Sequence, residues 1–189
     1  TGTIVSPVTS PYNLTGLSLS TNYEFQVRSV CSVSTSAYSS SSNFTTTSFT
    51  YCASNGNNTD NQYIGNVTFG TINNTTGAGA GGYSDFTSID TDVILNTSYL
   101  ISVTKIVSKG KPPSDAIRVW IDYNQNGDFE DTGELILNND ASTTTIITSN
   151  ITIPGTALLG ITRMRVSLKN GSSPSSCESF SFGEVEDYT

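Results

Sequence analysis

The stretch IRVWIDYNQNGDFED, residues 117–131, decides the fold because a strand pattern runs directly into an acidic, asparagine-rich loop. Ile117, Val119 and Ile121 recur at every second position, which is typical of a β-strand with one buried face. Oxygen-bearing side chains then occupy alternate positions, and Gly127 follows the third of them, where it allows a sharp turn. The stretch predicts a strand that ends in a loop wrapped around one cation.

The expected cofactor of this loop is Ca²⁺, because hard cations prefer carboxylate, amide and carbonyl oxygens. The candidate ligands are Asp122, Asn124, Asn126, Asp128 and one of Glu130 and Asp131. The twelfth loop position, where an EF-hand carries a bidentate glutamate, is Gly133, with Glu134 beside it, so an EF-hand is not expected. The alternative is a metal-free hairpin turn of Asp, Asn and Gly. We favour calcium because crowded carboxylates repel one another without a counter-ion.

Short strand patterns fill most of residues 51–189. They cover residues 64–70, 93–95, 99–104, 117–121, 134–137, 145–147, 151–153 and 162–167. Turn clusters at 73–77, 109–113 and 170–171 separate them. This spacing predicts an all-β chain, a β-sandwich or jelly roll with negligible helix.

Residues 1–48 predict part of a second β-sandwich. Tyr23, Phe25 and Val27 share one face at period two, and residues 43–47 would form the closing strand. The pattern resembles the second half of an immunoglobulin-like, fibronectin type III domain, in which Tyr23 would be the tyrosine corner that caps backbone groups. The alternative is a Ser/Thr-rich linker, against which the alternation argues.

Composition excludes several function classes. The 16 acidic and 8 basic residues give a net charge of −8, which disfavours nucleic acid as a partner. The chain has no histidine, so the usual catalytic triads and most zinc sites are excluded, and we expect no enzymatic activity. No apolar run approaches the roughly 20 residues of a membrane-spanning helix, so membrane insertion is not expected.

Several motifs together resemble the GEVED domain of secreted bacterial proteins across residues 51–189. They are Tyr51-Cys52, residues 82–87, residues 119–129, residues 151–154, residues 162–166 and the terminal Gly183-Glu184-Val185-Glu186-Asp187-Tyr188. The resemblance implies a disulfide between Cys52 and Cys177, and hence an oxidising compartment. Cys31 is then free or paired elsewhere. The terminal acidic residues would form ion pairs with Arg163 and Arg165, or else Glu186 or Asp187 would complete the calcium shell.

The resemblance implies an accessory role rather than a reaction. Such modules occur beside fibronectin-like repeats in adhesins, proteases and glycan-degrading proteins exported by Bacteroidetes-type bacteria. We therefore expect a non-catalytic, calcium-stabilised structural or adhesive module at the cell surface or secreted. The alternative is a carbohydrate-binding accessory module of a secreted hydrolase or protease. Glycans would stack on a platform of aromatic side chains, although packing in one layer of the sandwich is the expected role of Trp120. The candidates for this platform are Trp120, Tyr123, Phe129, Tyr83 and Tyr99.

Half a sandwich would leave an apolar face and unpaired strand edges in water. We therefore expect a neighbouring copy or repeat of the protein to supply strands to residues 1–48, as one unit of a fibre or tandem array. The alternatives are strands just upstream in the same polypeptide and a truncated monomer.

Nine asparagines stand in Asn-X-Ser/Thr sequons and are candidate glycosylation sites, although a chain this rich in Asn, Ser and Thr produces several by chance. They are Asn13, Asn43, Asn57, Asn66, Asn73, Asn74, Asn96, Asn150 and Asn170.

Overall fold

The computed structural model describes residues 3–6, 8–9, 12, 14, 17–18, 20–46, 50–108, 110 and 113–189. The chain divides into two compact units, Thr1–Phe49 and Thr50–Thr189. The strand-rich architecture confirms the predicted all-β class, since the described residues contain one short 3-10 helix, η1 (Ala80–Gly82), and no other helix. No helix in the described part of the chain has the length and apolar character that a membrane crossing requires.

The smaller unit contains an antiparallel pair of strands, β1 (Asn22–Phe25) and β2 (Ser42–Thr45). Phe44 stacks on Tyr23 with 5.7 Å between ring centroids. The expected strand ends at Phe25 because the next backbone N–H groups bond to serine hydroxyls and not to a neighbouring strand. Ser39 Oγ accepts from the Val27 N–H, and Ser36 Oγ accepts from the Ser29 N–H. The Tyr23 hydroxyl accepts a hydrogen bond from the Ser18 N–H at 2.7 Å, the kind of backbone cap that the sequence predicts. The fibronectin type III resemblance of this unit stays a prediction.

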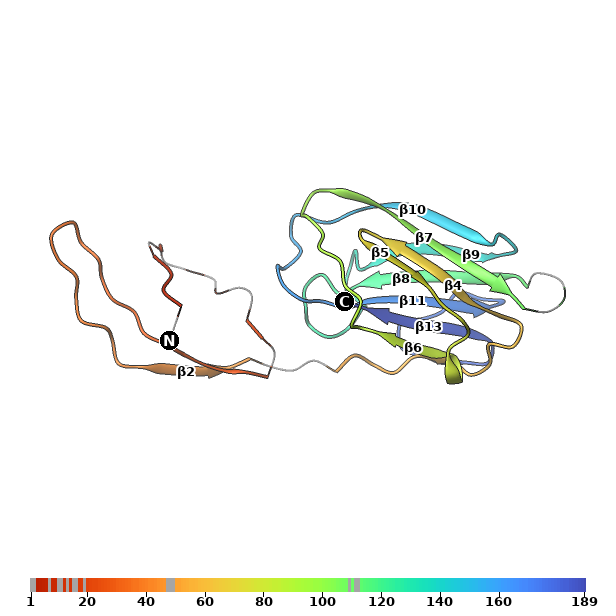
Figure 1. Cartoon of the computed structure of the whole chain (residues 1–189), viewed down its shortest axis with the longest axis horizontal. Helices are drawn as coiled ribbons and strands as arrows, with labels where there is room; N and C mark the ends of the chain where they lie inside the picture. Colours follow the sequence, from red (N-terminus) through yellow and green to blue (C-terminus); the bar gives the residue numbers. More distant parts are fainter. Residues whose placement is uncertain are drawn as a thin grey trace. The chain divides into compact units, whose positions relative to one another are not determined.

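The larger unit is a β-sandwich of two main sheets (Figure 1). The first sheet has the order β10-β7-β4-β5, with bounds Ile146–Thr152, Ser98–Val107, Gln62–Phe69 and Ile72–Thr75. The second has the order β6-β13-β11-β8-β9, with bounds Tyr83–Phe86, Gly183–Tyr188, Met164–Asn170, Asp115–Ile121 and Leu135–Ser142. Within this sheet only the β6–β13 pair is parallel.

Alternate residues of the two sheets meet in one hydrophobic core. Ile101 and Val103 of β7 face Ile117 and Val119 of β8 in this core, and all four are fully buried. Trp120 lies on the other face of β8, and it is also buried, as expected for a packing residue. This face is covered by other parts of the chain rather than by solvent.

Part of that cover comes from a small parallel pair, β3 (Asn55–Gly56) and β12 (Ser179–Phe180). The segments around these strands are joined by the disulfide between Cys52 and Cys177, whose Cα atoms lie 5.4 Å apart across 125 residues of sequence. The predicted disulfide is confirmed. Cys31 is a free, exposed thiol.

The expected secondary structure is wrong in three places. Residues 93–95 form no strand: the Asn96 N–H bonds to the Ile153 carbonyl, and the Tyr99 hydroxyl accepts from the Ile94 N–H. The expected turn at 73–77 contains β5, whose polar residues pair with β4 at a sheet edge. The two strands expected at 145–147 and 151–153 are replaced by one continuous strand, β10, which runs from Ile146 to Thr152.

Candidate metal centre

The predicted metal loop follows β8 directly, and Asp122 closes it. The buried Asp122 carboxylate accepts hydrogen bonds from the Asn126 and Gly127 N–H groups at 3.3 and 3.0 Å. The turn passes through Gly127 at φ +92°, where a glycine adopts the positive φ without strain, as the sequence predicts. Asn124 Oδ1 accepts from the Asn126 N–H, and Asp128 Oδ1 from the Glu130 N–H. These hydrogen bonds hold the loop in its conformation without help from a ligand.

Three carboxylates converge at the far end of this loop. Among the side chains that the structure describes, Asp128, Asp131 and Glu134 form a group whose ligand oxygens all lie within 4.8 Å of one another. Asp128 and Asp131 are exposed, whereas Glu134 is only 2% exposed. The cluster is therefore open to solvent on the side of the two aspartates and closed on the side of Glu134.

Glu134 is the unusual member of this cluster. Its Oε1 accepts the Tyr123 N–H at 2.9 Å and the Asn124 N–H at 3.4 Å, so the carboxylate is held firmly against the start of the loop. Its Oε2 is buried and has no hydrogen-bond partner. Burial raises the pKa of this carboxyl, and the charge of Asp122 adds to the effect. A buried, unpartnered carboxylate oxygen is costly unless a ligand satisfies it.

The remaining predicted ligands have other roles in the structure. The amides of Asn124 and Asn126 both donate to Asp131 Oδ2 at 2.7 Å and so hold this carboxylate in place. Glu130 is exposed and lies outside the group of three carboxylates. Glu134, which the sequence flags only as the neighbour of the twelfth loop position, is the buried acid of the cluster.

The loop is anchored from behind by aromatic side chains. Phe129 is buried within the loop and stacks on Tyr51 at 5.1 Å between centroids. The Tyr51 hydroxyl donates to Asp122 Oδ2 at 2.7 Å. The guanidinium groups of Arg163 and Arg165 lie over the rings of Tyr51 and Phe129, 4.8 and 5.1 Å from their centroids. The loop is therefore tied to the outer face of the β11 strand.

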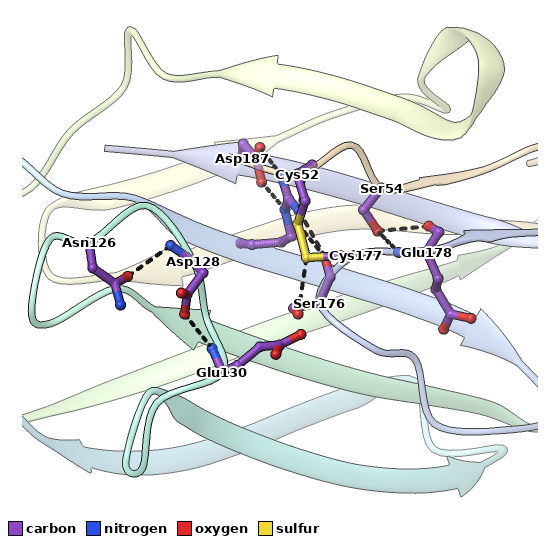
Figure 2. The surroundings of a disulfide bond; sticks show 10 residues. Cys52, Ser54, Asn126, Asp128, Glu130, Ser176, Cys177, Glu178 and Asp187 are labelled. Atoms are coloured by element: carbon purple, nitrogen blue, oxygen red, sulfur yellow. Dashed lines mark hydrogen bonds and ion pairs between the residues drawn. A yellow bond between two sulfur atoms is a disulfide. The ribbon is translucent and has the colours of Figure 1, made fainter. Parts of the chain in front are cut away.

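Arg165 is buried and forms the centre of a polar network behind the loop. Its Nε and Nη2 donate to the two carboxylate oxygens of Asp187 at 2.7 and 2.8 Å, and its Nη1 donates to the carbonyls of Cys52 and Ser176. Arg163 adds a third contact to Asp187 at 3.1 Å. Figure 2 shows Asp187 and the disulfide side by side, with Asn126, Asp128 and Glu130 on the neighbouring loop. Asp187 thus forms the predicted ion pairs with Arg163 and Arg165, and these arginines engage both of its carboxylate oxygens.

Glu184 and Glu186 lie on the opposite face of β13, inside the sandwich, and do not reach the two arginines. Glu184 accepts from the N–H groups of Ile64 and Gly79 at 2.9 and 2.6 Å, where a bulge interrupts β4. Glu186 accepts from the hydroxyls of Thr76 and Tyr188 at 2.9 and 2.7 Å. Burial raises the pKa of Glu186 to about 7. Neither glutamate belongs to the carboxylate cluster of the loop.

A surface cavity of about 370 Å³ lies next to the cluster. Asp131 and Glu134 form part of its wall, together with Tyr123, Asn124 and Asn150. The Tyr123 hydroxyl is buried without a hydrogen-bond partner in the described structure. The cavity therefore combines two carboxylates with amide groups and one aromatic ring.

The candidate glycosylation sites fall into two groups. Asn43, Asn57, Asn73, Asn96 and Asn150 are exposed. Asn66, Asn74 and Asn170 use their side-chain amide nitrogens in internal hydrogen bonds, and Asn170 is exposed as well. Asn13 lies outside the described residues.

The comparison with known protein families gives a match in the C-terminal part of the chain. Neither the curated proteins nor the solved structures provide a significant match. A family match begins within β8 and runs to the last residue, so it includes the candidate metal loop, Arg163, Arg165, Cys177 and the terminal acidic strand. The expected extension of the family to Tyr51 stays a prediction. Residues 116–189 match the GEVED domain.

Proposed function

We propose that this chain is a non-catalytic, calcium-stabilised β module of an extracellular protein with a structural or adhesive role. The observation that carries the calcium assignment is the buried Glu134 Oε2, which lacks a partner beside two further carboxylates. A divalent cation would supply the missing interaction.

The residues present fit calcium better than other metals. The cluster offers only oxygen ligands, which suit hard cations, and no histidine is available for the softer transition metals. The outer carboxylates are exposed, so water can fill further coordination positions of a large ion. When bound, Ca²⁺ would neutralise the repulsion among Asp128, Asp131 and Glu134 and join the two ends of the loop.

An extracellular location is supported by the disulfide. Structural disulfides persist in oxidising compartments and are rare in the cytosol. The bridge between Cys52 and Cys177 holds the two segments that cover Arg165, so its loss would disturb the packing behind the metal loop.

Calcium titration of the full chain tests the proposal. We expect heat of binding in calorimetry and a melting temperature that rises with Ca²⁺ and falls with a chelator, since a ligand that binds only the folded state stabilises it by mass action. Glu134→Gln should abolish both responses. Glu130→Gln is the matched control, because it removes an equal charge from the same loop outside the cluster, and it should keep them. Absence of heat and of any chelator effect in the unaltered chain would show a metal-free turn.

A carbohydrate-binding accessory role is the second candidate, and the cavity beside the cluster favours it. The broad aromatic platform considered for this role is reduced, because Trp120 and Phe129 are buried, which leaves Tyr123 at the cavity. A glycan array in the presence of Ca²⁺ is the appropriate measurement. Binding that is lost in Tyr123→Ala would support this role. An array without signals would contradict it and would favour the structural or adhesive role.

For the smaller unit we propose completion by strands from a neighbouring copy or repeat. Its apolar side chains Phe25, Val27 and Val30 are exposed around a two-stranded sheet, and such a sheet is not stable alone in water. Strand addition would supply main-chain hydrogen bonds and cover alternate side chains. The resulting assembly would be a fibre or a tandem array.

A further inference from the structure

A lysine and an aspartate lie inside the sandwich at one end of its core. The inward row of β7 is Ile101, Val103 and Lys105, and the inward row of β8 begins with Asp115 and continues with Ile117. The side chains of Lys105 and Asp115 are 1% and 0% exposed. Because β7 and β8 belong to different sheets, this pair bridges the two layers of the fold.

The contacts of the pair are not those of a well-formed ion pair. Lys105 Nζ lies 3.6 Å from Asp115 Oδ2, which is too far for a hydrogen bond, and Oδ2 has no other partner. Lys105 Nζ instead donates to the Ser142 carbonyl at 2.7 Å and lies 3.5 Å from the Asp115 carbonyl. A buried ion pair stabilises a fold only when its geometry is good and its remaining lone pairs are satisfied.

The surroundings favour the uncharged forms of both groups. Burial lowers the pKa of Lys105 and raises the pKa of Asp115, so the difference between the two is reduced. A neutral amine has two N–H donors and one lone pair. The two backbone carbonyls account for the donors, which leaves the lone pair for the side chain of Asp115.

We propose that Lys105 and Asp115 become joined, after folding, by a side-chain amide bond that ties the two sheets together. The Lys105 Nζ lone pair attacks Cγ of the protonated Asp115 carboxyl group and forms the N–C bond. The Cγ–Oδ2 bond breaks, and the hydroxyl group leaves with one amine proton as water. The products are one amide and one water molecule, and nothing is oxidised or reduced.

Asn170 is placed to assist this reaction. Its side-chain Nδ2 donates to Asp115 Oδ1 at 3.0 Å, from the position directly across the β8–β11 pair. Oδ1 is the oxygen on which negative charge develops when the amine attacks, and a fixed donor there stabilises that charge. The same bond directs Oδ2, the leaving oxygen, toward Lys105.

The bond would add a covalent cross-link between two sheets that otherwise contact each other through side-chain packing and hydrogen bonds, such as the one from the Ile64 N–H to Glu184. It involves no residue of the metal cluster and goes beyond the proposed calcium function. A module exposed to pulling forces would resist separation of its sheets at this end.

The mass of the purified full chain decides the proposal. After reduction of the disulfide, we expect the intact protein to be lighter than its sequence by one water. In a tryptic digest, cleavage after Lys105 should be blocked, and residues 29–109 should appear joined to residues 110–118. Lys105→Arg keeps the positive charge but lacks the nucleophile, and Asp115→Ala lacks the acceptor, so both should have the full mass of their sequences.

Wild-type protein with the full sequence mass, and with free residues 106–109 in the digest, would overturn the proposal even if neither variant folds. A loss of ammonia in place of water, or a loss of water mapped to other residues, would overturn it as well. Asn170→Ala provides a kinetic readout, since the linked fraction in freshly folded protein should rise more slowly than in the wild type.

Discussion

The two units of the chain use the same strand pattern, but in the part of the chain that the structure describes only the larger unit covers its apolar face. In Thr50–Thr189, alternate side chains of two sheets meet, and residues such as Ile101 and Val119 are fully buried. In the smaller unit, Phe25 and Val27 stay 44% and 63% exposed. A period-two pattern therefore predicts strands in both units, but burial requires a second layer. Among the described residues, the buried and connected polar networks, such as the one around Arg165, also lie in the larger unit.

The largest expected effect comes from a comparison of Arg165 in the larger unit with Arg28 in the smaller one, each of which lies over an aromatic ring. Arg165→Ala should destabilise the larger unit by about 3–5 kcal/mol, because it leaves Asp187 as a buried charge without its bidentate partner. Arg28→Ala removes the exposed contact between Arg28 and the Tyr38 ring and should cause no measurable change. Urea unfolding followed by the fluorescence of Trp120, the only tryptophan, reports on the larger unit.

Arg165→Lys is a second variant that keeps the prediction testable if Arg165→Ala does not fold. It keeps the positive charge but cannot reproduce the paired bonds to Asp187, so its stability should lie between those of the wild type and Arg165→Ala. Equal stability of Arg165→Ala and Arg28→Ala would show that the buried network contributes nothing to the difference between the units.

A medium effect is expected from pH. The pKa of Glu186 is about 7 in the folded chain because of burial, well above the ordinary value of a glutamate, so the folded state holds a proton that the unfolded chain has already lost. The stability from this group is fully present below the unfolded pKa of about 4.3 and is lost as the pH rises to about 7. Glu186→Gln should remove a change of about 1–3 kcal/mol across this window.

Urea unfolding of both proteins at several pH values measures that difference. The control is Glu24→Gln in the smaller unit, which should leave the pH profile of the larger unit unchanged. A wild-type profile that rises from pH 5 to 7 relative to Glu186→Gln would contradict the assignment.

The sequence predicts the parts of this molecule that depend on local pattern. The strands around 117–121 and 162–167 carry clear alternation, and the loop after β8 contains the turn glycine and the oxygen-bearing side chains that shape it. The disulfide is also predicted, from the family resemblance, and the structure confirms it.

The parts that the sequence did not predict depend on contacts between distant segments. Strand β5 is polar, so only its pairing with β4 distinguishes it from a turn. The role of Glu134 depends on its burial next to Tyr123, which no local spacing encodes. Glu184 and Asp187 are close in the terminal motif but lie on opposite faces of β13, and one serves the β4 bulge while the other binds Arg165.

The smallest effect on stability, and the sharpest test of the comparison, concerns exposed apolar residues. Phe25→Thr combined with Val27→Thr should leave the unfolding of the larger unit unchanged, because both side chains lie in the smaller unit and are largely exposed. If their exposure reflects a face that other strands cover, the variant should associate less than the wild type in light scattering at high concentration. Leu100→Thr is the matched control, since Leu100 is 58% exposed on β7, a strand that already has neighbours on both sides, and it should not alter association. Equal association of all three proteins would mean that the exposed residues of the smaller unit recruit no strands and that its apolar pattern has another cause.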